Sequence, residues 1–155
     1  TRVHDMFPEK HAYWTEGGPD IRQPDYATDW AKWSETFSGI LRNRARCIVS
    51  WNLLLDEMGR PNIGPFSCGG LMTIDSKTQQ LTRSGQYWAF AHYSKVLQRG
   101  ARILGSSGDL PGIAHVAAEN PDGSRVLVVT NQRSAQSVQC TLGARALALE
   151  LPPDS

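Results

Sequence analysis

The chain has 155 residues, about the size of one domain, and its 16 basic residues nearly balance its 15 acidic ones, for a net charge of +1. No basic patch or charged tail stands out, which argues against nucleic acid and anionic membranes as partners. The longest apolar runs fall far short of the roughly 20 residues that span a bilayer. The three cysteines form no CxxC pair and the four histidines show no metal-ligand spacing, so we expect no metal site.

The first expected elements are a strand and a helix. Residues 11–15 (HAYWT) are short and aromatic and end at Gly17-Gly18, a pattern typical of a buried strand followed by a loop. After a loop rich in Gly and Pro, Thr28 or Asp29 is expected to cap a helix. The apolar face of this helix consists of Trp30, Trp33, Phe37, Ile40 and Leu41.

A second strand and helix follow. Residues 47–55 (CIVSWNLLL) are a continuous apolar run, as expected of a parallel strand that is covered on both faces. The Gly- and Pro-rich residues 56–70 form a loop of a length that is usually functional in a compact domain. A short strand is expected at 71–75, and Ser84 is expected to cap a helix that runs through Leu97.

The pattern changes near Gly105, after which short strands alternate with turns. Residues 113–119 and 125–130 are predicted strands joined by Asn-Pro-Asp-Gly, in which Pro presets φ and Gly accepts a positive φ. Two more strands are expected at 137–142 and 146–151. This part of the chain is therefore predicted to be an antiparallel β module.

The predicted fold class is α/β plus β, with two incomplete parts. Residues 1–104 hold two β/α units, whereas a closed barrel needs eight, and residues 105–155 hold the β module. Two parallel strands with hydrophobic runs leave unpaired edges and apolar faces. We therefore expect the half-barrel to be covered, by self-association or by packing on the β module.

Glu16 is the candidate catalytic residue. It stands at the C-terminal end of the first predicted strand, where α/β barrels keep their catalytic groups. A carboxylate at this place can attack the anomeric carbon of a sugar. The alternative is a loop-edge glutamate in a salt bridge.

Trp51 and Asn52 lie at the same place in the second unit. The indole can stack on a pyranose ring and the amide can bind a hydroxyl group, whereas the alternative for Trp51 is a buried ring beneath the loop. Asp56 and Glu57 follow near the same rim. Adjacent acids after a strand are more often solvated turn residues than catalytic groups.

Four segments of the chain, in order, resemble glycoside hydrolase family 30, the family that contains glucosylceramidase. They are FPEKHAYWTEGG at 7–18, WNLLLDEMGRPN at 51–62, SGQYWAFAHYSKVLQRGA at 84–101 and HVAAENPDGSRVLVVTN at 115–131. The resemblance implies a (β/α)8 barrel with a β-sandwich side domain. This chain would supply the last two units of the barrel and most of the sandwich.

The resemblance also implies roles for the candidate residues in a retaining hydrolase that acts on a β-glucoside or a related β-glycan. Glu16 corresponds to the nucleophile, and Trp51 and Asn52 correspond to residues of the sugar site. Glucosylceramidase has an active-site Asn where Phe66 aligns, so the resemblance leaves the sugar and its aglycone open. No cofactor is implied, and relatives of this kind are commonly outside the cytoplasm, secreted or periplasmic.

A retaining glycosidase needs a second carboxyl group about 5–5.5 Å from the nucleophile, to act as acid and base. The resemblance assigns that group to a strand to which nothing in this chain corresponds. We therefore expect the isolated 155-residue chain to be inactive. The alternative function is a non-catalytic carbohydrate-binding or assembly module derived from a glycosidase barrel, and the upstream coding sequence discriminates between the two.

Overall fold

The computed structural model describes residues 2–62, 64 and 67–155, so Phe66 lies outside the described residues. Three helices are α1 (Arg2–Met6), α2 (Trp30–Arg42) and α3 (Gly85–Val96). The strands are β1 (Ala12–Trp14), β2 (Ala45–Ile48), β3 (Leu54–Asp56), β4 (Met72–Ile74), β5 (Leu81–Arg83), β6 (Arg102–Leu104), β7 (Ile113–Glu119), β8 (Arg125–Asn131), β9 (Gln136–Leu142) and β10 (Arg145–Leu151).

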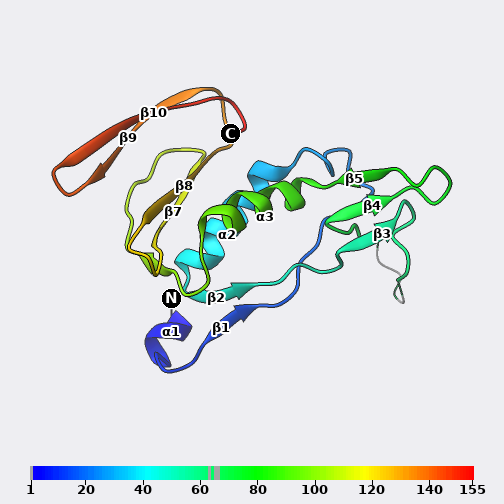
Figure 1. Ribbon diagram of the computed structural model, residues 1–155, viewed down its shortest axis with the longest axis horizontal. Helices are drawn as coiled ribbons and strands as arrows, with labels where there is room; N and C mark the ends of the chain where they lie inside the picture. The colour runs from blue at the N-terminus through cyan, green and yellow to red at the C-terminus, as the bar shows by residue number, and fades with distance from the viewer. Residues whose placement is uncertain (1, 63, 65–66) are drawn as a thin grey trace.

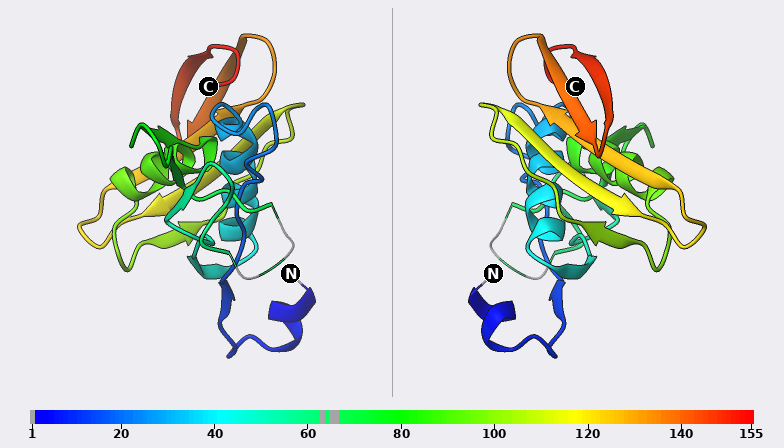
Figure 2. Two further views of the ribbon diagram at one scale, coloured as in Figure 1. Left: turned by 90° about the vertical axis from the view of Figure 1, so that its right-hand side faces the viewer. Right: turned by 90° about the vertical axis from the view of Figure 1, so that its left-hand side faces the viewer.

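The two long helices occupy the centre of an elongated molecule. Figure 1 shows α2 and α3 between the β1–β2 pair on one side and β7–β8 on the other, with β3–β4–β5 at one end and the β9–β10 hairpin at the other. The side views in Figure 2 show the long β7–β8 ribbon crossing these helices. None of the helices in the part of the chain that the structure describes has the length and apolar character of a bilayer-spanning segment.

One hydrophobic core joins the helices to strands on both sides. Its centre is Phe37, which is fully buried and contacts Ala89, Tyr93 and Val116. Trp14 of β1 packs against the same cluster from the other side, with its ring edge-on to Phe37 at a centroid distance of 6.3 Å. Burying each such large side chain stabilises the fold by about 1.5–3 kcal/mol. Four residues of the predicted apolar face of α2 lie in or against this core: Trp33, Phe37, Ile40 and Leu41. The fifth, Trp30, stacks on His92 of α3 instead.

The pairing of the strands confirms several predictions. β1 and β2 are adjacent and parallel, and β7 and β8 are antiparallel in full register. The turn between β7 and β8 closes with a 2.8 Å bond from the Asn120 N–H to the Ser124 carbonyl, and Gly123 has the expected positive φ of 82°. Ser84 caps α3, since its Oγ accepts a bond from the Tyr87 N–H.

The prediction of one strand over residues 47–55 is wrong. The run is divided between β2 and β3, and the described residues 49–53 form neither helix nor strand. Two polar residues explain the break. Ser50 turns its side chain to other polar groups, and Asn52 has a positive φ of 61°, which a strand does not accommodate. β3 then pairs parallel with β4, in a different sheet from β2.

Two further strands were not predicted. β5 pairs antiparallel with β4, so the segment before α3 is a hairpin and not a single strand. β6 pairs antiparallel with β7 and completes a three-stranded sheet. The division of the chain at residues 104 and 105 stays a prediction.

Candidate active site

Two strand ends lie side by side where the candidate residues stand. The Val49 N–H donates to the Trp14 carbonyl at 2.8 Å, and the Trp51 N–H donates to the Gly17 carbonyl at 3.1 Å. These bonds continue the parallel pairing of β1 and β2 beyond the strands themselves. Glu16 and Trp51 therefore lie on adjacent segments that run in the same direction. Both side chains are exposed to solvent, that of Trp51 to 48%.

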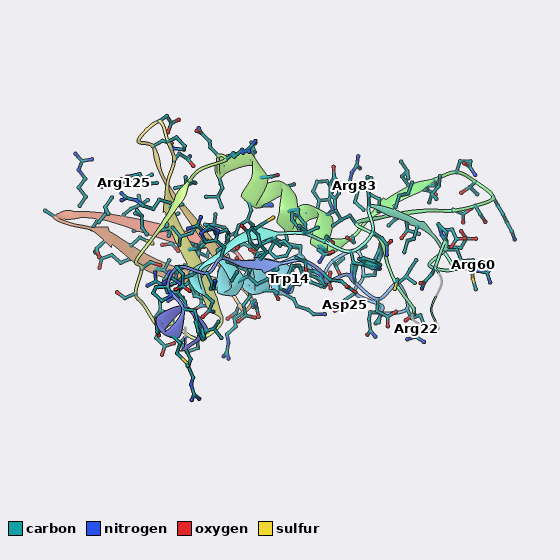
Figure 3. All side chains as sticks on the ribbon, turned by 90° about the horizontal axis from the view of Figure 1, so that it is seen from below. Trp14, Arg22, Asp25, Arg60, Arg83 and Arg125 are labelled. Atoms are coloured by element: carbon teal, nitrogen blue, oxygen red, sulfur yellow. The ribbon has the colours of Figure 1, made fainter. Side chains whose placement is uncertain are left out.

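The two glycines after Glu16 are required by close contacts. A Cβ on Gly17 would lie 2.1 Å from the ring atoms Cη2 and Cζ2 of Trp14, and a Cβ on Gly18 would lie 3.1 Å from the Trp51 carbonyl oxygen. Trp14, labelled in Figure 3, lies near the centre of the molecule. Trp14 thus packs against the core, whereas Glu16, which lies between Trp14 and Gly17 in sequence, is exposed to solvent.

A buried amide lies directly behind the two strand ends. Gln86, in the first turn of α3, is fully buried. Its Nε2 donates to the Gly17 carbonyl at 3.1 Å, and its Oε1 accepts a 2.6 Å bond from the Ser50 hydroxyl. Sequence reasoning missed both residues, because a single Gln in an aromatic helix and a single Ser in an apolar run carry no spacing signal.

The loops around this edge are held to one another by a buried tyrosine. The Tyr26 hydroxyl donates to the Gly70 carbonyl at 2.8 Å and lies 2.7 Å from the Thr73 hydroxyl oxygen. Burial raises the pKa of Tyr26, so its phenol stays protonated near neutral pH. The Gly69 N–H adds a 2.7 Å bond to the Pro19 carbonyl. The loop after β1 is thereby fixed to the segment before β4.

The acidic residue of that loop, Asp20, is held by a cation and a hydroxyl. Arg22 and Ser67 both donate to it. The Arg22 bonds, followed by the Ser67 bond, hold the pKa of Asp20 well below its usual value of 3.8. Asp20 therefore stays ionised and is occupied in fixing the loop.

Asp56 and Glu57 hold turns. One oxygen of Asp56 accepts bonds from the N–H groups of Met58 and Arg60, at 2.9 and 2.6 Å. Glu57 accepts from the Ser76 N–H and hydroxyl, and these bonds lower its pKa. A general acid at neutral pH needs a raised pKa. Both carboxylates agree with the turn interpretation, and the lowered pKa makes Glu57 unsuited to replace a missing acid/base.

A groove in the described part of the chain lies apart from the Glu16 edge. Within residues 2–62, 64 and 67–155, no three His, Cys, Asp or Glu side chains gather as a metal site. A groove between the β6–β7–β8 sheet and the β9–β10 hairpin is lined mostly by aliphatic side chains, and neither Glu16 nor Trp51 lines it. The roles of Glu16, Trp51 and Asn52 stay predictions.

Comparison with known sequences supplies the family. Residues 100–155 match the family model described as the glycosyl hydrolase family 30 beta sandwich domain. The Endo-1,6-beta-D-glucanase of Neurospora crassa is 32% identical over 143 residues, which are 85% of this chain and 29% of that protein. Putative glucosylceramidase 1 of Caenorhabditis elegans is 26% identical over 149 residues, 90% of this chain and 28% of that protein. The chain thus spans less than a third of the length of these relatives.

Solved structures give the same result for the fold. The endo-beta1,6-glucanase BT3312 superposes with a TM-score of 0.86 at 25% identity, covering 99% of this chain and 36% of that one. SrfJ from Salmonella typhimurium superposes with a TM-score of 0.89 at 27% identity, covering 99% and 35%. The resemblance inferred from the four sequence segments is confirmed. Residues 100–155 match the β-sandwich domain of glycoside hydrolase family 30, and most of the chain is similar to proteins named as endo-1,6-β-D-glucanases and glucosylceramidases.

Proposed function

We propose that this chain is the nucleophile-bearing part of a retaining glycoside hydrolase, with Glu16 as the nucleophile. The observation that carries the proposal is the pairing of two parallel strand ends, one followed by an exposed Glu16 and the other by an exposed Trp51. The strand–helix–strand order of β1, α2 and β2 fits the last units of a (β/α)8 barrel, whose catalytic groups stand at this end of the strands.

The proposed substrate is a β-1,6-linked glucan. Relatives named as endo-1,6-β-D-glucanases are 30–32% identical to this chain, whereas those named as glucosylceramidases are 22–28% identical. An open, half-exposed Trp51 suits a sugar ring that arrives as part of a longer polymer, because an exposed indole offers a flat apolar face for stacking. Asn52, half-buried beside it, would bind a hydroxyl of the same sugar.

In the proposed reaction the Glu16 carboxylate attacks the anomeric carbon and the glycosidic C–O bond breaks. The departing oxygen takes its proton from a second carboxyl group, and water later hydrolyses the glycosyl-enzyme with that group acting as base. Asp56 and Glu57 hold turns, and the lowered pKa of Glu57 makes it unsuited to this second role. The acid/base would therefore come from a part of the barrel outside this chain, and a secreted or periplasmic enzyme would meet such a glucan.

The test compares the wild-type complete gene product with its Glu16→Gln variant on a β-1,6-glucan oligosaccharide and on an aryl β-glucoside. Removing a nucleophile is expected to lower kcat by on the order of 10³-fold or more. An activated 2-deoxy-2-fluoro β-glucoside should label the wild-type protein on the peptide that contains Glu16, detected by mass spectrometry.

Glu9→Gln is the matched control, because Glu9 is an exposed glutamate that precedes the same strand. It should retain wild-type rates. Full activity in Glu16→Gln, or a label on another carboxylate, would overturn the assignment. Residues 1–155 alone should not hydrolyse an alkyl β-glucoside, whose leaving group needs the acid.

A further inference from the structure

We propose that Gln86 is a positioning residue that sets the place of Glu16 and Trp51 together. This inference rests on the proposed function, since it takes Glu16 as the nucleophile. Gln86 touches neither sugar nor nucleophile. It acts through the backbone of the segment that carries Glu16 and through the side chain that precedes Trp51.

The segment around Glu16 is anchored on both sides. Before it, the Trp14 carbonyl accepts the bond from the Val49 N–H, and after it, the Gly17 carbonyl accepts bonds from the Trp51 N–H and from Gln86 Nε2. The Gly17 oxygen lies 3.1 Å from the Trp51 nitrogen, 3.1 Å from Gln86 Nε2 and 3.2 Å from Ser50 Oγ. The Gln86 amide is a side-chain donor that no strand pairing would supply, whereas the single proton of the Ser50 hydroxyl goes to Gln86 Oε1, which is nearer at 2.6 Å.

Gln86 connects the two candidate segments because its amide both donates and accepts. Nε2 donates to Gly17, next to Glu16, while Oε1 accepts from Ser50, next to Trp51. One flat, buried group thus fixes the spacing between both strand ends. A buried donor or acceptor without a partner costs about 1–3 kcal/mol, so the arrangement with both bonds made is strongly preferred.

The position of Gln86 is itself fixed by the start of α3. The Ser84 hydroxyl caps the helix, and the Gly85 N–H donates to the Tyr26 carbonyl at 2.9 Å. A Cβ on Gly85 would lie 2.5 Å from the Trp30 nitrogen, so α3 starts in close contact with the start of α2. Gln86 therefore reaches the strand ends from a rigid base, which is what a positioning group requires.

The test uses two substitutions in the complete gene product. Gln86→Met keeps the length of the side chain and removes both hydrogen bonds. Because misplacing a reacting group by about 1 Å can cost on the order of 100-fold, kcat on the aryl β-glucoside should fall by about 10- to 100-fold, by the same factor at every pH.

Gln86→Glu tests the positioning role by the pH dependence of activity, which would not change if Gln86 were only structural. As a neutral acid the introduced carboxyl can still donate to Gly17 and accept from Ser50, whereas as a carboxylate it turns an acceptor toward the Gly17 carbonyl. Burial raises the pKa of such a group. The activity relative to wild type should therefore fall by about 10-fold or more as pH rises through that pKa.

Tyr93→Phe and Glu16→Gln are measured beside these variants. Tyr93→Phe disturbs a buried polar cluster that includes no candidate residue, and should leave kcat unchanged. The inference about Gln86 would be overturned, and the proposed function kept, by three results together. These are a wild-type kcat in Gln86→Met, an activity of Gln86→Glu relative to wild type that does not change with pH, and an inactive Glu16→Gln. An active Glu16→Gln, or a wild type that neither turns over nor is labelled, would overturn the proposed function and this inference with it. If Gln86→Met does not fold, the pH profile of Gln86→Glu decides.

Discussion

Two polar clusters link elements of this molecule, and they differ in burial and in what lies next to them. The strand-end cluster consists of the Gly17 carbonyl, Ser50 and Gln86. The hydroxyl cluster joins α2, α3 and β8 and consists of Ser34, Ser38, Tyr93 and Thr130. All four members of the hydroxyl cluster are buried, with exposed fractions of 1–5%.

The hydroxyl cluster satisfies its own groups within the core. The Tyr93 hydroxyl donates to the Ser34 carbonyl at 2.7 Å and lies 2.8 Å from Ser38 Oγ, while Ser34 Oγ lies 2.5 Å from the Thr130 hydroxyl oxygen. In the strand-end cluster, by contrast, the buried Gln86 amide donates to the Gly17 carbonyl, beside the exposed Glu16. The same chemistry thus stabilises an interface in one place and orients a candidate site in the other.

Gly17→Ala should have the largest effect on stability and activity, because Gly17 is itself a member of the strand-end cluster. The added methyl group would lie 2.1 Å from the Trp14 ring, and Trp14 is packed edge-on against Phe37. Overpacking of this kind costs about 1–3 kcal/mol, and displacement of the Gly17 carbonyl should lower kcat by about 100-fold. Denaturant unfolding and hydrolysis of the aryl β-glucoside measure the two effects.

Gly39→Ala is the matched control for this prediction. Gly39 lies inside α2, and nothing lies within 4 Å of a Cβ placed there. Alanine at a helix interior is expected to stabilise by about 0.5–1 kcal/mol, with unchanged kcat. Wild-type activity in Gly17→Ala would show that the strand end tolerates movement, and would remove the distinction between the two clusters.

Tyr93→Phe tests the hydroxyl cluster. The change leaves the Ser38 hydroxyl, which is 1% exposed, without its 2.8 Å partner. An unsatisfied buried hydroxyl costs about 1–3 kcal/mol, so the free energy of unfolding should fall by that amount while kcat stays unchanged. The double variant Tyr93→Phe/Ser38→Ala should lose less free energy of unfolding than the sum of the losses in the two single variants, because the two side chains share one interaction. Strict additivity would contradict the assigned coupling.

The two long helices, α2 and α3, and the long hairpin could be predicted from sequence because their signals are local, whereas α1 was not predicted. The apolar spacing from Trp30 to Leu41 gives α2, Ser84 supplies the cap of α3, and Gly123 has the positive φ that its turn requires. Each of these features depends on residues a few positions apart. Periodicity and turn chemistry are sufficient to describe such features.

The strand-end cluster could be predicted only in part. The position of Glu16 before Gly17-Gly18 indicated a loop after a strand, and the structure agrees. The expectation that this strand is buried is wrong, because Ala12 and Tyr13 are exposed and only Trp14 is half-buried. Gln86 lies 69 positions from Gly17 in sequence, and a contact of that separation leaves no local trace. The run 47–55 also read as one strand, because apolar composition does not reveal that Ser50 turns toward Gln86 or that Asn52 adopts a positive φ.

Glu119→Gln should have the smallest effect and contrasts an exposed polar cluster with the other two. Glu119 accepts a 3.0 Å bond from Arg125 Nε and a 2.8 Å bond from an Arg102 guanidinium nitrogen. These bonds, that of Arg125 first, lower the pKa of Glu119 below its usual 4.5.

A lowered pKa in the folded state adds stability at pH values above the pKa of the unfolded state. That stability is lost as pH falls through the pKa of the folded state. Glu119→Gln should therefore lower Tm slightly at pH 7 and not at all in strong acid, and roughly 1 M salt should shrink the difference because exposed pairs are screened. Glu150→Gln serves as the control in the same thermal scans, because the Glu150 carboxylate on β10 accepts a bond from the neutral Ser137 hydroxyl of β9. A Tm difference that persists in acid or grows with salt would show that the Glu119 cluster acts through packing and not through charge.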